Sequence, residues 1–154
     1  MEKGIQVLCN HNQLIAVIAR PSNLFGPINP NEHNQYINNN LIHILKNEPL
    51  EKKANYFRDF IFVKDVADAL MQMAVQAKKH NGMTFNISYE KTYSGEEIVD
   101  ALVAVTKGEK LSIHPVEGNT VYSSRLRNQL NWKPTYTVEQ GLMETFEWYK
   151  KKLG

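Results

Sequence analysis

Two short stretches of the sequence carry side chains that could hold a phosphate or a sugar. The first, RPSNLFGP, begins at Arg20 and follows the apolar run LIAVIA. Its Asn23 has an amide that can donate a hydrogen bond to a phosphate oxygen or a sugar hydroxyl. Pro21 fixes the backbone, and Gly26-Pro27 permits a tight reversal. The alternative interpretation is that Asn23 only closes a local Asx turn.

The second stretch, YFRDFIFVKDVADAL, places a cation just before an apolar run. Arg58 is flanked there by aromatic Tyr56, Phe57 and Phe60. A planar guanidinium can grip a phosphate with two parallel hydrogen bonds, whereas a lysine acts as a point charge. Two other interpretations remain open for Arg58: an ion pair with the adjacent Asp59, or a cation that only faces solvent.

Alternating strands and helices must position these side chains. The run 14–19 is continuously apolar and rich in β-branched residues, which predicts a strand covered on both faces. Further strands are predicted at 60–62, 83–88 and 110–114. Helices are predicted over 1–9, 35–46, 63–79, 98–106 and 138–151. This alternation predicts the α/β class, in which ligands bind beyond the carboxyl ends of strands.

Two predicted helices begin with a capping box. Ser94 with Glu97, and Thr137 with Gln140, have the spacing at which each residue can satisfy the other's backbone amide. In the helix that begins within the second stretch, Asp65 is expected to be a first-turn charge and Asp68 a solvent-facing residue.

Composition excludes several classes of function. The formal charge is +2, from 18 basic and 16 acidic residues, so no nucleic-acid partner is expected. No apolar run approaches the roughly 20 residues that span a bilayer, so no membrane partner is expected. Cys9 is the single cysteine, which suits a cytoplasmic location, and the histidines show no metal-ligand spacing. We therefore expect a cytoplasmic protein without a metal site.

Four motifs taken in order resemble one protein family. RPSNLFGP, RDFIFVKDVADAL, FNISYEKTYSGEEIVDAL and LNWKPTYTVEQGLMETFEWY are similar to the carboxyl-terminal half of the extended short-chain dehydrogenase/reductases, the NAD(P)-dependent sugar-nucleotide epimerases and dehydratases. The resemblance runs over nearly the whole chain. It implies the last helix and strand of a Rossmann-like domain over 1–29 and a small mixed α/β substrate-binding domain over 30–154. Residues 83–88 are candidates to return to the Rossmann sheet.

The resemblance also implies roles for individual residues. Asn23 matches the asparagine that contacts the diphosphate of the nucleotide sugar, and Arg58 matches a second phosphate contact. Pro21 and Ser22 match a backbone segment near the nicotinamide of NAD or NADP. The implied partner is a nucleotide sugar carrying UDP, dTDP, GDP or CDP.

Three departures from the family pattern concern the second half of the chain. An arginine-containing R-P-G-D element is replaced by Val116–Asn119, so that cation is absent. Tyr122 stands where an aspartate is usual. Arg125 or Arg127 could supply the missing charge, or both could lie on a solvated helix face. Asn131 stands where a glycine is usual, and asparagine tolerates a left-handed helix cap.

The sequence contains neither a glycine-rich turn for a dinucleotide nor a tyrosine followed by lysine four residues later. The family pattern places the catalytic lysine a few residues before the position of Glu2. We therefore expect a fragment without catalytic residues that binds no cofactor and is inactive alone. The strand at 14–19 is expected to lack a neighbour and to cause self-association or pairing with an N-terminal half. The alternative is a non-catalytic binding or interaction module derived from this family.

Overall fold

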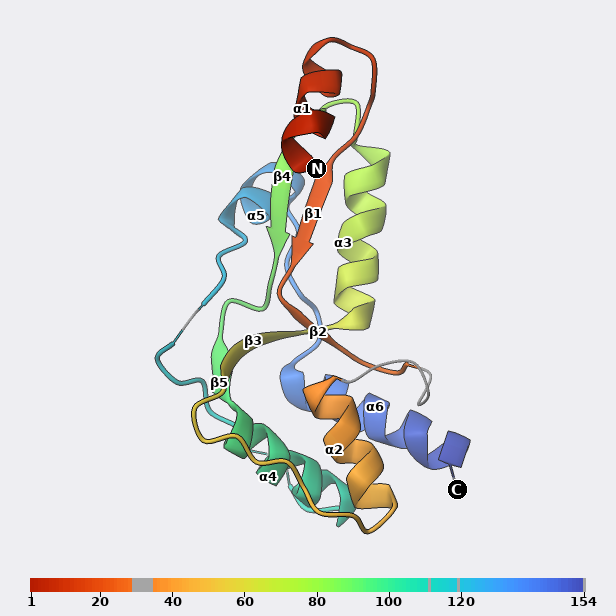
Figure 1. Ribbon diagram of the computed structural model, residues 1–154, viewed down its shortest axis with the longest axis vertical. Coiled ribbons are helices and arrows are strands. Elements are labelled where there is room, and N and C mark those ends of the chain that lie inside the picture. Colours follow the sequence, from red (N-terminus) through yellow and green to blue (C-terminus); the bar gives the residue numbers. More distant parts are fainter. Residues whose placement is uncertain (29–34, 111, 119, 154) are drawn as a thin grey trace.

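The computed structural model describes residues 1–28, 35–110, 112–118 and 120–153, and it confirms the mixed α/β class. The expected domain boundary at residues 29 and 30 lies outside these ranges. The molecule is elongated (Figure 1). Its N-terminal end contains strands and helices in the order α1 (Glu2–Asn10), β1 (Ile18–Pro21), α3 (Val63–Val75), β4 (Thr84–Ile87) and α5 (Ser124–Leu130).

The opposite end is a helical layer, with a small sheet between the two ends (Figure 1). The helices are α2 (Tyr36–Leu45), α4 (Gly95–Thr106) and α6 (Val138–Leu153). The small sheet is formed by β2 (Asn23–Phe25), β3 (Phe57–Phe62) and β5 (Thr92–Ser94). The chain therefore passes from the first sheet into the second between Pro21 and Asn23, inside the RPSNLFGP stretch.

Strand pairing links distant parts of the chain. β1 runs parallel to β4, with Ile18 opposite Thr84 and Pro21 opposite Ile87. β2 runs parallel to β3, with Asn23 opposite Phe60. β3 runs antiparallel to β5 on its other edge. β3 is thus the central strand of the small sheet and has a neighbour on each side.

Two sequence-based expectations about strands are wrong. The first strand begins at Ile18 rather than Leu14, and Leu14 and Ile15 are 38% and 54% exposed. The reason is that β4 begins only at Thr84, which pairs with Ile18, so a parallel ladder cannot form earlier. The strand expected at 110–114 is not formed by residues 112–114, and Leu111 lies outside the described residues. Val116 makes a single antiparallel bridge to Thr92 instead.

Two hydrophobic clusters stabilise the two ends. One joins aromatic side chains of β2 and β3 to α2, α4 and α6, and its fully buried members include Leu41, Leu102 and Leu142. The other joins α3, β4 and α5 around Phe85 and Leu126.

Local cap predictions are largely confirmed. Ser94 accepts the amide of Glu97 at 3.2 Å, although the Glu97 carboxylate turns to the amide of His114. Thr137 and Gln140 form the complete reciprocal pair. Asn131 ends α5 with φ of 53°, the left-handed conformation expected where the family pattern has glycine.

The start of α3 anchors the segment that leads into α6. Asp65 is buried, and its carboxylate accepts hydrogen bonds from the Thr135 amide and hydroxyl and from the Tyr136 amide. Asp68 accepts the indole N–H of the buried Trp132 at 3.0 Å. Asp65 thus lies in the first turn of α3 as expected, although it is buried, and Asp68 is exposed as expected while also bonding Trp132.

Candidate functional site

Parallel pairing of β2 and β3 brings the two sequence-predicted ligand contacts onto one face of the small sheet. Asn23 pairs with Phe60, and paired residues of parallel strands project to the same side. Because side chains alternate along a strand, Arg58 projects to that side as well. The amide and the guanidinium therefore share a face although they are 35 positions apart in the sequence.

Asn23 lines a pocket of about 240 Å³ in this face. The other lining residues are Leu24, Phe25, Gln35, Tyr36, Ile37, Tyr56 and Phe60. The amide nitrogen of Asn23 donates to the backbone carbonyl of Asp59 at 3.1 Å, which fixes the orientation of the side chain. Asn23 thus lies within strand β2 and bridges to β3, so the Asx-turn interpretation does not describe it.

Arg58 lies at the rim of the same pocket. Its guanidinium carbon is 4.5 Å from the centre of the Tyr56 ring, and one of its terminal nitrogens donates to the Phe57 carbonyl at 2.9 Å. Because Tyr56 lines the pocket that contains Asn23, this ring connects the two polar groups. Arg58 is not itself a lining residue, so it would act from the edge.

The proposed ion pair between Arg58 and Asp59 is not present. Asp59 projects to the opposite side of β3, where its carboxylate accepts the Ser22 hydroxyl at 3.1 Å and the Tyr89 amide at 3.0 Å. The residue is 1% exposed, and burial raises the pKa of this carboxyl in spite of these hydrogen bonds. The guanidinium of Arg58 therefore has no carboxylate from its neighbour.

The wall of the pocket is aromatic. The ring centres of Tyr36 and Tyr56 are 4.7 Å apart, and those of Tyr56 and Phe60 are 6.3 Å apart. Burial raises the pKa of the Tyr36 phenol above its ordinary value. Aromatic rings beside a few fixed polar groups are typical of small-molecule sites. Here the polar groups, an amide and a guanidinium, suit a phosphate.

The end of β1 offers little hydrogen-bonding capacity for a cofactor. The Ser22 amide donates to the Ile87 carbonyl at 2.9 Å, and the Ser22 hydroxyl donates to Asp59. Pro21 has no amide hydrogen. Residues 21 and 22 could contact a nicotinamide through their apolar edges and carbonyls. The sequence has no glycine-rich turn of the kind that binds a dinucleotide pyrophosphate.

Neither alternative cation near α5 reaches the pocket. Arg125 donates to the Thr84 carbonyl at 3.0 Å, and Arg127 lies 3.0 Å from the Glu90 carboxylate. Burial alone would raise the pKa of Glu90, but hydrogen bonds from Ser123 and the charge of Arg127 outweigh it and lower that pKa. Both arginines thus have partners around α5 and do not line the pocket with Asn23.

Sequence reasoning missed Tyr36, which begins α2 and lines the pocket with its ring centre 4.7 Å from that of Tyr56. It also missed that Asp59, on the opposite side of β3, joins this strand to the end of β1 through Ser22. No local pattern marked Tyr36, because its role depends on how α2 packs beside β3.

Across the described ranges, no group of three or more His, Cys, Asp or Glu side chains could hold a metal, and no helix is long and apolar enough to cross a membrane.

The structure is that of a mixed α/β protein with a pocket beside its parallel strands β2 and β3. A sequence profile of the NAD-dependent epimerase/dehydratase family matches residues 1–88, more than half of the chain. The chain therefore belongs to the NAD-dependent epimerase/dehydratase family.

Individual relatives agree with this assignment. The dTDP-glucose 4,6-dehydratase of Xanthomonas campestris pv. campestris is 29% identical over 117 residues, which cover 66% of this chain and 33% of that protein. The UDP-glucose 4-epimerase of Mycolicibacterium smegmatis is 30% identical over 101 residues, which cover 62% of this chain and 32% of that protein. This chain thus matches about a third of the length of these relatives.

Solved structures match the chain almost completely. A UDP-glucose 4-epimerase of Thermotoga maritima, solved with UDP-glucose, has a TM-score of 0.83 at 21% identity, covering 99% of this chain and 52% of that one. The Bordetella bronchiseptica enzyme WbmF, solved with NAD+ and UDP, has a TM-score of 0.83 at 24% identity, with 99% and 51% covered. Such low identities show the fold alone, the Rossmann-like fold of these enzymes, of which this chain spans about half.

Proposed function

We propose that this chain provides the diphosphate-binding site for a nucleotide sugar in a NAD(P)-dependent epimerase or dehydratase. The observation that carries the proposal is the placement of Asn23 and Arg58 on one face of adjacent parallel strands, with Tyr56 lining the pocket of Asn23 and contacting the Arg58 guanidinium. The family membership of the chain, and the UDP and UDP-glucose bound in structures of similar fold, support this choice of ligand.

The pocket offers a ligand both charged or polar groups and aromatic surface. Arg58 would hold phosphate oxygens through its planar fork, and Asn23 would contribute its fixed amide. At about 240 Å³ the pocket is smaller than most sites for whole drug-sized ligands. It would therefore enclose only part of a nucleotide sugar, with the remainder lying along the aromatic rim.

We also propose that the polypeptide of residues 1–154 binds a nucleotide without turning it over. Its sequence offers no glycine-rich turn for the cofactor and no tyrosine–lysine pair at the spacing that acid–base catalysis in this family uses. Tight binding of NAD or NADP would need a glycine-rich turn that this sequence does not supply. Incubation with NAD(P) and a panel of nucleotide sugars should yield no epimerised or dehydrated product, and detectable product would contradict this proposal.

The edge of β1 is proposed as a pairing surface. Among the described residues β1 pairs only with β4, and the exposed Leu14 and Ile15 lie in the segment before it. An open strand edge with apolar neighbours favours association with another polypeptide, either a second copy of this chain or a segment that completes the sheet. Light scattering should show association for residues 1–154. A monomer that unfolds cooperatively would count against it.

Calorimetric titration tests the proposed site directly. UDP and dTDP should release or absorb heat on binding to the full chain, whereas uridine, which lacks the phosphates, should bind far more weakly. A non-catalytic module that has lost the nucleotide-sugar site should bind neither nucleotide. Absence of binding by both UDP and dTDP would therefore reject the proposed function and favour that alternative.

A further inference from the structure

A buried asparagine fixes the segment that leads into the site. This strap, residues 47–56, connects α2 to β3. The side chain of Asn40 is fully buried, and its amide holds Glu51 by both backbone groups. Asn40 Oδ1 accepts the Glu51 amide at 2.8 Å, and Asn40 Nδ2 donates to the Glu51 carbonyl at 3.3 Å and to the Tyr36 carbonyl at 2.9 Å. The strap is therefore anchored two residues before Lys53.

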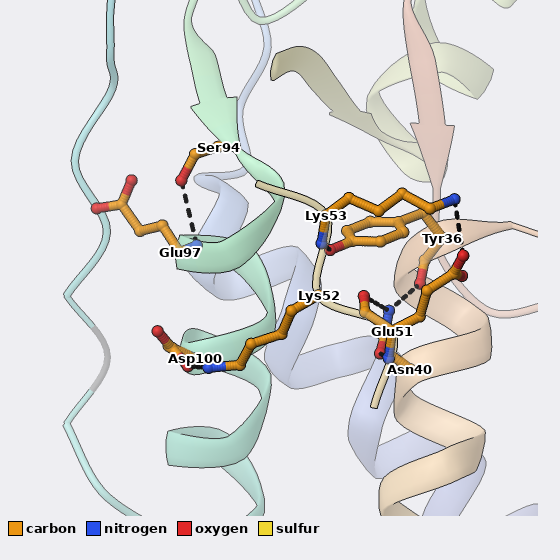
Figure 2. Close-up of polar contacts among 8 residues, drawn as sticks. All are labelled: Tyr36, Asn40, Glu51, Lys52, Lys53, Ser94, Glu97 and Asp100. Carbon is orange, nitrogen blue, oxygen red and sulfur yellow. Dashed lines mark hydrogen bonds and ion pairs between the residues drawn. The ribbon is translucent and has the colours of Figure 1, made fainter. Parts of the chain in front are cut away.

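The two lysines that follow this anchor point in different directions (Figure 2). Lys52 forms an ion pair with Asp100 on α4. Lys53 instead extends over the aromatic wall, with Nζ 5.4 Å from the ring centre of Tyr36 and 5.6 Å from that of Tyr56. The Lys53 amide also donates to the Tyr36 hydroxyl at 3.4 Å. Backbone and side chain of Lys53 thus both contact the wall of the pocket.

Two cations therefore lie against the Tyr56 ring, the ammonium of Lys53 and the guanidinium of Arg58. A diphosphate ester carries at least two negative charges, which one arginine does not balance. The family's other arginine is replaced by the segment that begins at Val116, and Arg125 has its own partner beside α5. A second cation at the rim would supply the positive charge that the family motifs of this chain lack. Lys53 lies outside those motifs, so they do not identify it.

We propose that Lys53 is a second anion-binding residue of this site, with specificity for a diphosphate ester. This inference rests on the proposed function. On binding, the Lys53 ammonium would exchange its contact with the Glu51 carboxylate, now at 2.9 Å, for a phosphate oxygen. The side chains of Lys53 and Glu51 are 46% and 47% exposed, and such exposed pairs contribute little to stability. The exchange therefore has a small cost.

The chain contains a matched control, because Lys52 is the adjacent residue and carries the same charge. We would compare Lys53→Met with Lys52→Met; methionine keeps the apolar stem that covers the rings and removes the ammonium. Lys53→Met should weaken UDP binding about three- to tenfold, between the effects of an exposed ion pair and a charged hydrogen bond. Lys52→Met should change it less than about twofold. Lys53→Arg should restore most of the affinity.

Uridine and salt distinguish charge from packing. Uridine should bind all four proteins equally, and the UDP affinity of Lys53→Met should depend less on ionic strength than that of the wild type. Equal effects of Lys53→Met and Lys52→Met, with UDP still bound by the wild type, would overturn the role of Lys53 and leave the proposed function standing. An equal loss of uridine binding would also overturn it. If the wild type does not bind UDP, both proposals fail.

Discussion

Replacing Arg58 with alanine tests the proposed site most severely among single substitutions. A hydrogen bond to a charged group contributes about 1.5–3 kcal/mol, so losing the guanidinium should weaken UDP binding by about ten- to hundredfold. The structure favours a real contribution because the guanidinium is already ordered, 4.5 Å above the Tyr56 ring and bonded to the Phe57 carbonyl. Little side-chain entropy then remains to be lost when the ligand binds.

Calorimetry with UDP is the assay, and two further variants make it specific. Arg58→Lys keeps the charge but loses the planar fork, so its affinity should fall between those of the wild type and Arg58→Ala. Arg125→Ala removes an arginine whose guanidinium donates to the Thr84 carbonyl outside the pocket, and it should leave UDP affinity unchanged. Thermal unfolding of each variant checks that the fold is retained, since the stacking contact itself is expected to contribute about 0.5–1 kcal/mol.

Two results would refute this reasoning. UDP affinity that is unchanged in a folded Arg58→Ala protein would remove Arg58 from the site. An equal loss in Arg125→Ala would show that general positive charge, rather than the geometry around Tyr56, attracts the nucleotide.

Three further predictions concern stability. Burial raises the pKa of Asp59, so the folded chain binds the carboxyl proton of Asp59 more tightly than the unfolded chain does. The free energy of unfolding therefore includes the full contribution of this proton below the ordinary aspartate pKa. That contribution is lost as the pH rises through the raised pKa. Asp59→Asn should abolish this loss in urea titrations at several pH values, and parallel pH profiles would contradict the assignment. Gly141→Ala would place a Cβ 2.7 Å from the Phe25 ring and should lower the free energy of unfolding by about 1–3 kcal/mol. Gly4→Ala, in open space on α1, should raise the free energy of unfolding by about 0.5–1 kcal/mol. Equal shifts of the urea midpoint in the two variants would refute the packing argument. Asn131→Ala should lower the free energy of unfolding by about 1–2 kcal/mol, because φ of residue 131 is 53°, whereas Asn131→Gly should leave it almost unchanged. An Asn131→Ala protein that melts at the wild-type temperature would contradict the left-handed cap.

Local signals in the sequence predicted those features whose causes are local. Asn131 indicated a left-handed cap because few residues other than glycine adopt that conformation, and the structure has it. Thr137 and Gln140 predicted the start of α6 from three-residue spacing alone. The start of the first strand could not be predicted in this way. Leu14 is as apolar as Ile18, but only Ile18 has a partner in β4, 66 residues later in the chain.

The site was predictable only in part for the same reason. The motifs identified Asn23 and Arg58, but whether they share a face depends on the register between β2 and β3. Asp59 next to Arg58 suggested an ion pair, yet alternation along β3 sends the two side chains to opposite sides. Lys53 was indistinguishable from Lys52 in the sequence, and only the hydrogen bonds of Asn40 to Glu51 explain why one lysine reaches the aromatic wall.

A crystal structure of this chain with UDP would test the central claim most directly. The account predicts that the diphosphate lies at the rim of the Tyr56 pocket, within hydrogen-bonding distance of both the Asn23 amide and the Arg58 guanidinium. Diphosphate density in the separate pocket of about 300 Å³ that Arg20 and Arg125 line would contradict it.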